Sequence, residues 1–82
     1  MSPIETDIND KSVTLSFNIP IYDQKHLLQA SKDFSENFWV IMHQETENQI
    51  LINLKPKEEN SIKDLNEIAY EFYNYALGLM QQ

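Results

Sequence analysis

The chain of 82 residues contains no cysteine, no arginine and a single glycine, Gly78. Without cysteine it can form neither a disulfide nor a thiolate metal site, which fits a reducing compartment. Loops that cradle phosphates need clustered glycines, because backbone N–H groups must come close to the ligand. The sequence therefore carries no P-loop and no dinucleotide-binding motif.

Positive charge is scarce as well. All six basic residues are lysines, they face 13 acidic residues, and the net charge is −7. Nucleic acids and anionic membranes are held by clustered cations, and arginine is preferred for bidentate phosphate contacts. We therefore expect no nucleic-acid partner and no membrane partner.

Long apolar runs are also missing. No stretch approaches the roughly 18 apolar residues of a membrane span, and the first 20 residues lack the basic start and apolar run of a signal peptide. These features predict a cytoplasmic protein. Its length allows one small domain, near the lower limit of what a single core stabilises without staples.

The residues that usually carry catalysis do not form a pattern. His26 and His43 are the only histidines, and neither has a second ligand at metal-type spacing. His43 near Glu45 and Glu47 offers at most a weak metal site, and the other carboxylate pairs lie in polar, solvated segments. An enzyme would need one of the histidines beside a buried carboxylate. We expect no catalytic residue, no metal, no cofactor and no enzymatic activity.

The first half of the chain predicts an arm, a strand and a helix. Residues 1–11 are polar and are expected to form a flexible N-terminal arm, followed by one α+β domain over residues 12–82. Strict apolar–polar alternation over residues 12–18 predicts a strand with one wet face. Asp23 is a plausible N-cap for an amphipathic helix that runs to about Glu36, although Leu28 lies off its apolar stripe.

Two apolar runs follow, at residues 38–43 and 50–54, joined by a polar turn. This arrangement predicts a β-hairpin. The first run is apolar on both faces of any strand, so the hairpin is either central in the sheet or covered on its outer face. Trp39 fits both a buried core position and an interface anchor.

The last segment, residues 61–82, predicts a helix that begins at a capping box of Ser61 and Asp64. The fold class that follows is α+β, a two-layer sandwich with the order β-α-β-β-α. Its three-stranded, largely antiparallel sheet would carry both helices on one face. We favour the arrangement in which the strand at 50–54 lies between the other two.

Apolar side chains cover more of this last helix than one contact face requires. The apolar arc spans roughly 200°, whereas a stripe of about 100° suffices for packing on a sheet. The flank with no obvious partner consists of Tyr70, Tyr73, Leu77 and Met80. Either the first helix covers this flank or a partner does, and we favour the partner because exposed apolar area marks interaction sites.

Asn74 lies at the border between this flank and the polar sector. Asparagine is a mediocre helix former, so its side-chain amide either faces solvent or binds a cap, a loop or a partner's backbone. We favour the binding role.

The segment from Ile21 to Leu79 resembles the small HxsD-like proteins of the His-Xaa-Ser system. The likeness rests on the following residues: Tyr22, Leu28, Ala30, Phe34, the strands at 40–42 and 50–54, Lys55-Pro56-Lys57, Phe72-Tyr73-Asn74, Ala76 and Leu77. Tyr75 stands where these proteins carry an acidic residue, and their final arginine is absent. The resemblance implies an accessory protein encoded beside radical S-adenosylmethionine enzymes thought to modify a His-Xaa-Ser repeat peptide. It implies no catalytic residue.

The sequence thus predicts a non-catalytic protein-binding module that forms a homodimer or docks on a larger enzyme or a peptide. The alternative is a carrier of a small peptide or small molecule, with a pocket between sheet and helices. The expected partner interface comprises Trp39, Tyr70, Tyr73, Asn74, Leu77 and Met80.

Overall fold

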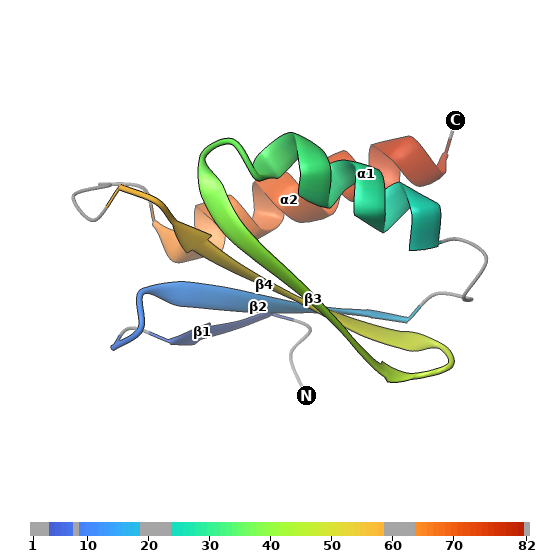
Figure 1. Cartoon of the computed structure of the whole chain (residues 1–82), viewed down its shortest axis with the longest axis horizontal. Helices are drawn as coiled ribbons and strands as arrows, with labels where there is room; N and C mark the ends of the chain where they lie inside the picture. The colour runs from blue at the N-terminus through green and yellow to red at the C-terminus, as the bar shows by residue number, and fades with distance from the viewer. Residues whose placement is uncertain (1–3, 8, 19–23, 59–63, 82) are drawn as a thin grey trace.

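The computed structural model describes residues 4–7, 9–18, 24–58 and 64–81 of the chain. They form a four-stranded antiparallel sheet and two helices (Figure 1). The elements in chain order are β1 (Ile4–Asp7), β2 (Ser12–Asn18), α1 (Gln24–Phe34), β3 (Phe38–Thr46), β4 (Gln49–Pro56) and α2 (Leu65–Met80). The predicted α+β class is confirmed, but the predicted count of three strands was wrong.

The additional strand, β1, lies in the segment that we expected to be a flexible arm. It pairs antiparallel with β2, so that Ile4 lies opposite Leu15 and Asp7 opposite Ser12. In the turn that follows, the Asp10 N–H donates to the Asp7 carboxylate at 3.1 Å. Lys11 takes the left-handed position of this turn, with φ of 53°. No glycine therefore marks the turn in the sequence.

The strands are arranged in the order β1-β2-β4-β3. Strand β4 lies between β2 and β3, as the sequence analysis favoured, with Leu15 opposite Ile52 and Met42 opposite Ile52 on its other side. The predicted β-hairpin is confirmed as β3 and β4, with a register shift between Gln44 and Thr46. Strands β1 and β3 form the two edges of the sheet.

Both helices lie on one side of the sheet (Figure 1). Helix α2 contacts β2 and β1, helix α1 contacts β3, and the helices contact each other. The core between helices and sheet consists of twelve buried hydrophobic residues: Val13, Leu15, Phe17, Leu27, Ala30, Ile50, Ile52, Leu54, Ile68, Ala69, Phe72 and Ala76. The alternate residues of β2 and β4 supply half of this core, because successive strand side chains point to opposite faces.

Both helices are shorter than the sequence predicted. Helix α1 ends at Phe34 instead of about Glu36, and the expected N-cap Asp23 lies outside the described residues. Helix α2 is capped by Asp64, whose side chain accepts from the Asn66 N–H at 2.8 Å. The expected capping residue Ser61 also lies outside the described residues. A carboxylate at this position satisfies a free N–H group and interacts favourably with the helix dipole.

Candidate interaction surface

The outer face of the sheet, opposite the helices, changes from polar to apolar across its strands. On the polar side, the Asn53 amide of β4 donates to Thr14 Oγ1 at 3.0 Å and to Ser12 Oγ at 3.4 Å, both in β2. The Gln49 amide similarly donates to Ser16 Oγ at 3.0 Å. Because of these cross-strand hydrogen bonds, the polar side chains on the β2 side of the outer face already have partners within the chain.

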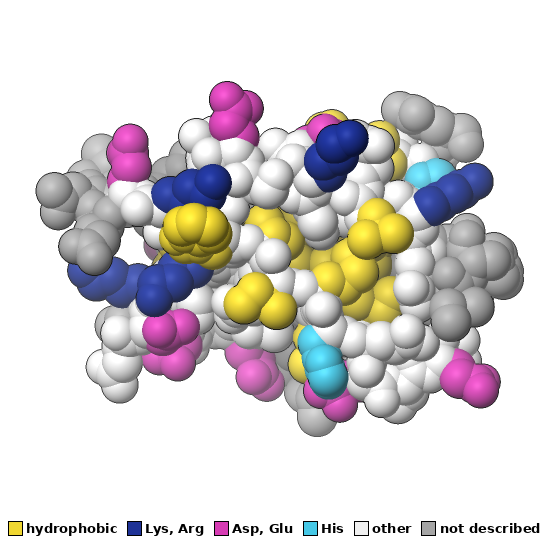
Figure 2. All heavy atoms as spheres, viewed as in Figure 1, with side chains coloured by type: hydrophobic (Ala, Val, Ile, Leu, Met, Phe, Trp, Pro, Cys, Tyr) yellow, Lys and Arg dark blue, Asp and Glu magenta, His cyan; other side chains and the backbone are white. Residues whose placement is uncertain are grey.

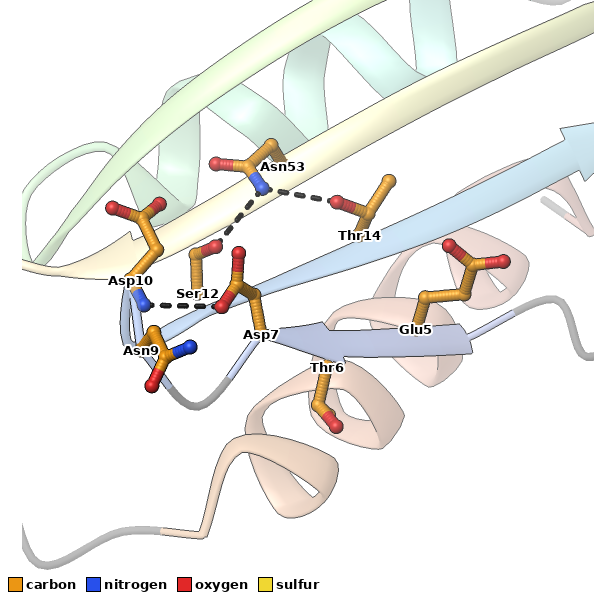
Figure 3. Close-up of a pocket in the computed structure, with 8 residues that line it drawn as sticks. All are labelled: Glu5, Thr6, Asp7, Asn9, Asp10, Ser12, Thr14 and Asn53. Carbon is orange, nitrogen blue, oxygen red and sulfur yellow. Dashed lines mark hydrogen bonds between the residues drawn. The ribbon is translucent and has the colours of Figure 1, made fainter.

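A polar hollow lies at the β1 end of this face (Figure 3). Its lining comprises Glu5, Thr6, Asp7, Asn9, Asp10, Ser12, Thr14 and Asn53. Lys55 approaches the Asp10 carboxylate at 3.3 Å, and this hydrogen bond holds the pKa of Asp10 below its ordinary value. The hollow lies on the outer face of the sheet. The carrier alternative would place a pocket between sheet and helices, but the core side chains pack in that space.

The apolar side of the outer face belongs to β3. Trp39 is 60% exposed and Ile41 is 63% exposed, whereas Phe38, Val40 and Met42 on the other face pack against the core. We call Trp39 and Ile41 the strand surface. Because Trp39 is exposed, the alternative that placed it in the core was wrong. The Lys57 ammonium lies 4.7 Å from the centre of the Trp39 ring, a cation–π contact that the sequence did not suggest.

A further exposed apolar residue, Leu28, lies on α1 and is 58% exposed. Five residues further along α1, Asp33 accepts a hydrogen bond from Tyr75 of α2. Five residues of α-helix turn the chain by roughly 140° beyond a full turn, so Leu28 faces away from α2. It therefore lies on the flank of α1 above the β3 edge. Figure 2 shows hydrophobic side chains in a broken band across the face that presents α1 and β3.

The backbone of β3 completes this region. Its one strand neighbour in the described sheet is β4, so its second side has unpaired N–H and C=O groups. Strand β3 has nine residues and contains no proline, glycine or lysine, and its one acidic residue is Glu45 near the end. Apart from the register shift between Gln44 and Thr46, the edge lacks the devices that usually prevent pairing with another strand.

The predicted helix residues form a second surface, on the flank of α2 that faces away from α1. Tyr70 is 59% exposed, Asn74 is exposed, and Leu77 is half-buried. We call Tyr70, Asn74 and Leu77 the helix surface. Helix α1 does not cover this flank, because it packs on the opposite side of α2, where Phe34 contacts Tyr75.

Tyr73 and Met80 have partners within the chain, which differs from the expectation. The Tyr73 ring stacks on Phe17 of β2 with centroids 5.5 Å apart, and Met80 packs against the core. Trp39 is separated from all the helix residues, because it lies on the opposite face of the sheet and on the β3 edge, whereas α2 covers β2 and β1. The six predicted interface residues therefore do not form one surface.

Within the part of the chain that the structure describes, the titratable residues show no arrangement typical of an active site. His43 Nε2 lies 3.6 Å from a Glu45 carboxylate oxygen, and both side chains are exposed. Among the described residues, no group of three or more His, Cys, Asp or Glu is placed to hold a metal ion. Asp33 accepts the hydrogen bond from the Tyr75 hydroxyl and thereby raises the pKa of this phenol, a contact that links the two helices.

Neither α1 nor α2, the helices of the described ranges, has the length and apolar character of a membrane-spanning segment.

Comparisons of the chain with protein-family models, with curated proteins and with solved structures each found no match. The geometry and the chemistry of the surfaces are therefore the basis for the function proposed below.

Proposed function

We propose that this chain is a non-catalytic protein-binding module that associates with a second copy, a larger enzyme or a peptide through the strand surface. The observation that carries the proposal is the exposure of Trp39 and Ile41 side by side on the outer face of β3. Exposed neighbouring apolar residues on a small protein mark interaction sites, and tryptophan is enriched among residues that dominate binding energy.

The surroundings of the strand surface support this role. Lys57 borders Trp39, which gives the apolar centre a polar rim of the kind found at protein interfaces. On the other half of the sheet, side-chain amides and hydroxyls bind one another, so this half offers a partner fewer free groups. A partner therefore gains most by contacting β3.

The resemblance to HxsD-like proteins supports an accessory role and adds two candidate partners, a radical S-adenosylmethionine enzyme and its peptide substrate. The helix surface is a second predicted contact, since Tyr70 is as exposed as Trp39. We place it second because its neighbours Tyr73 and Met80 already pack within the chain.

Site-specific photo-crosslinking in the cells that make the protein tests the proposal. A photoreactive phenylalanine analogue replaces Ile41 in one variant, Ser16 in a second and Tyr70 in a third. Ser16 serves as the control, because it lies on the same face of the sheet but in its polar half. We expect crosslinks to protein from position 41 and few from position 16, and mass spectrometry identifies what is captured.

Equal crosslinking from positions 41 and 16 would contradict the proposal, because the strand surface would then have no preferred contact. Crosslinks from position 70 alone would move the binding site to the helix surface. Captured protein is expected to be this same chain, a larger enzyme or a peptide, and its identity separates these partner classes.

A further inference from the structure

We propose that the partner at the strand surface is a second copy of this chain, and that the two β3 strands pair antiparallel to join both sheets into one. This inference rests on the proposed function and specifies its partner. It is carried by three observations: the open edge of β3, the position of Ile41 in its regular part, and complementary groups at its two ends.

The open edge offers backbone hydrogen-bonding groups that no strand of the described sheet uses. The groups along one side of β3 have no strand neighbour in the described sheet. Apolar residues border this edge on both faces, with Trp39 and Ile41 on the outer face and half-buried Val40 and Met42 on the inner face. A strand that pairs here would gain backbone hydrogen bonds and would cover apolar side chains together.

The regular part of β3 determines the register. Pairing with β4 is regular from Phe38 to Gln44, and the register shift follows between Gln44 and Thr46. Ile41 is the central residue of this regular part. A two-fold axis at Ile41 places Ile41 of one copy opposite Ile41 of the other, and Val40 opposite Met42. Apolar residues then meet apolar residues on both faces of the joined sheet.

The same register brings unlike groups together at the ends. Trp39 of one copy faces His43 of the other, and Glu45 follows two residues after His43. In each copy Glu45 lies 3.6 Å from His43, and Lys57 lies 4.7 Å from the Trp39 ring. The Glu45 carboxylate of one copy therefore comes within reach of the Lys57 ammonium of the other, at both ends of the seam.

This complementarity is the reason for choosing a second copy in the antiparallel direction. A parallel, in-register pair would place Glu45 directly opposite Glu45, and like charges directly opposite are destabilising. The chain has a net charge of −7, so two copies repel at long range. The local contacts at the seam oppose this repulsion. Added salt screens both the repulsion between the copies and the exposed attraction between Glu45 and Lys57.

Sedimentation velocity over a wide concentration range tests the pairing. We expect the wild type to form a dimer and Ile41→Lys to raise the dimer dissociation constant by about 100-fold. Each copy loses one apolar contact, and each loss is worth roughly tenfold. Tyr70→Lys is the matched control, because Tyr70 is 59% exposed and Ile41 is 63% exposed, but Tyr70 lies on α2. We expect this control to dimerise like the wild type.

A charge exchange tests the register without removing an apolar residue. Lys57→Glu and Glu45→Lys should each weaken the dimer several-fold, and the double variant should recover most of the loss. Hydrogen exchange gives an independent readout. Alternate amides of β3 should become protected as the protein concentration rises, because an edge strand points every second N–H group outward.

A chain that remains monomeric at high concentration would overturn this inference. A dimer whose β3 amides stay unprotected would also overturn it, because the copies would then associate face to face. If position 41 crosslinks to a different protein while the chain is monomeric, the proposed function stands and the second copy is excluded. If position 41 crosslinks to nothing above the control, both proposals fail.

Discussion

The two edge strands of the sheet, β1 and β3, differ in how well they are protected against pairing with another chain. Strand β1 has four residues, and two of them, Glu5 and Asp7, place carboxylates on the outer face. Strand β3 has nine residues and presents Trp39 and Ile41 on the same face. Short length and charge are the usual means by which proteins keep an edge from pairing with another chain. The β1 edge is protected in this way, and the β3 edge is not.

The difference between the two edges indicates where a partner would bind. Hydrophobic exposure alone would rank Trp39, Ile41, Tyr70 and Leu28 as similar, since all four are between 58% and 63% exposed. Adding the unpaired backbone of β3 separates Trp39 and Ile41 from Tyr70, which lies on a helix whose backbone bonds are internal. The three predictions below either break or sharpen this contrast. They add to the crosslinking and sedimentation tests described above.

The largest expected effect compares two isoleucines on neighbouring strands. Ile52 of β4 is fully buried, and Ile41 of β3 is 63% exposed. Ile52→Ala should lower the free energy of unfolding by about 2–5 kcal/mol, because it leaves a cavity in the core. Ile41→Ala should change it by less than about 0.5 kcal/mol in the monomer. Urea unfolding at low protein concentration measures both.

An equal loss from the two isoleucine substitutions would show that Ile41 is buried in solution even at low concentration. The β3 edge would then be covered permanently in an obligate dimer, and it would no longer count as an unprotected edge.

A smaller effect is expected from deletion of residues 1–7, which removes β1. The half-buried side chain of Ile4 packs against the core, so its loss should lower the free energy of unfolding by about 1–2 kcal/mol. Pairing at β3 should persist, because β1 is at the opposite edge of the sheet from β3. Urea unfolding and sedimentation of the truncated chain check both statements. A truncated chain that no longer dimerises would assign the seam to the β1 side.

The smallest expected effect depends on pH. The hydrogen bond from Lys55 lowers the pKa of Asp10, so the folded chain binds fewer protons at this carboxyl than the unfolded chain does. The contribution to stability is therefore fully present above the unfolded pKa and is lost as the pH falls through the lowered, folded pKa. Lys55→Met should reduce the fall of the melting temperature in acid.

The matched control for this prediction is Lys57→Met, with both variants melted at low protein concentration so that the proposed contact between Glu45 and Lys57 of two copies does not form. Lys57 lies over Trp39 and makes no contact with Asp10 that the structure shows. Both lysines are near the end of β4. The same acid response in both variants would mean that the net charge of the protein determines how steeply the melting temperature falls with pH. The contact between the β1–β2 turn and β4 would then not determine it.

Much of this fold could be predicted, because periodicity is a strong local signal. The alternation of Val13, Leu15 and Phe17 and the run from Phe38 to Met42 determine β2 and β3. Strand β1 was missed because it has four residues, of which Ile4 is the one apolar residue. Its place depends on pairing with β2 and on a turn whose left-handed residue is Lys11.

The candidate site was predicted in part for a similar reason. Both faces of residues 38–42 are apolar and one core can cover only one face, so the sequence predicts that one of the two faces is exposed. It does not predict which face, because Trp39 fits both a core position and an interface position. The position of Tyr73 does not follow from the sequence either. A helical angle gives the direction of a side chain relative to its helix, but the contact with Phe17 depends on where α2 lies above the sheet.

The chain has one tryptophan, Trp39, and it lies beneath Lys57 in the strand surface. Its indole is therefore an intrinsic optical probe of that location, and no label is required. Transfer of this ring from water to an apolar contact shifts its emission to shorter wavelength. The emission wavelength measured over a dilution series would therefore report association and dissociation at β3.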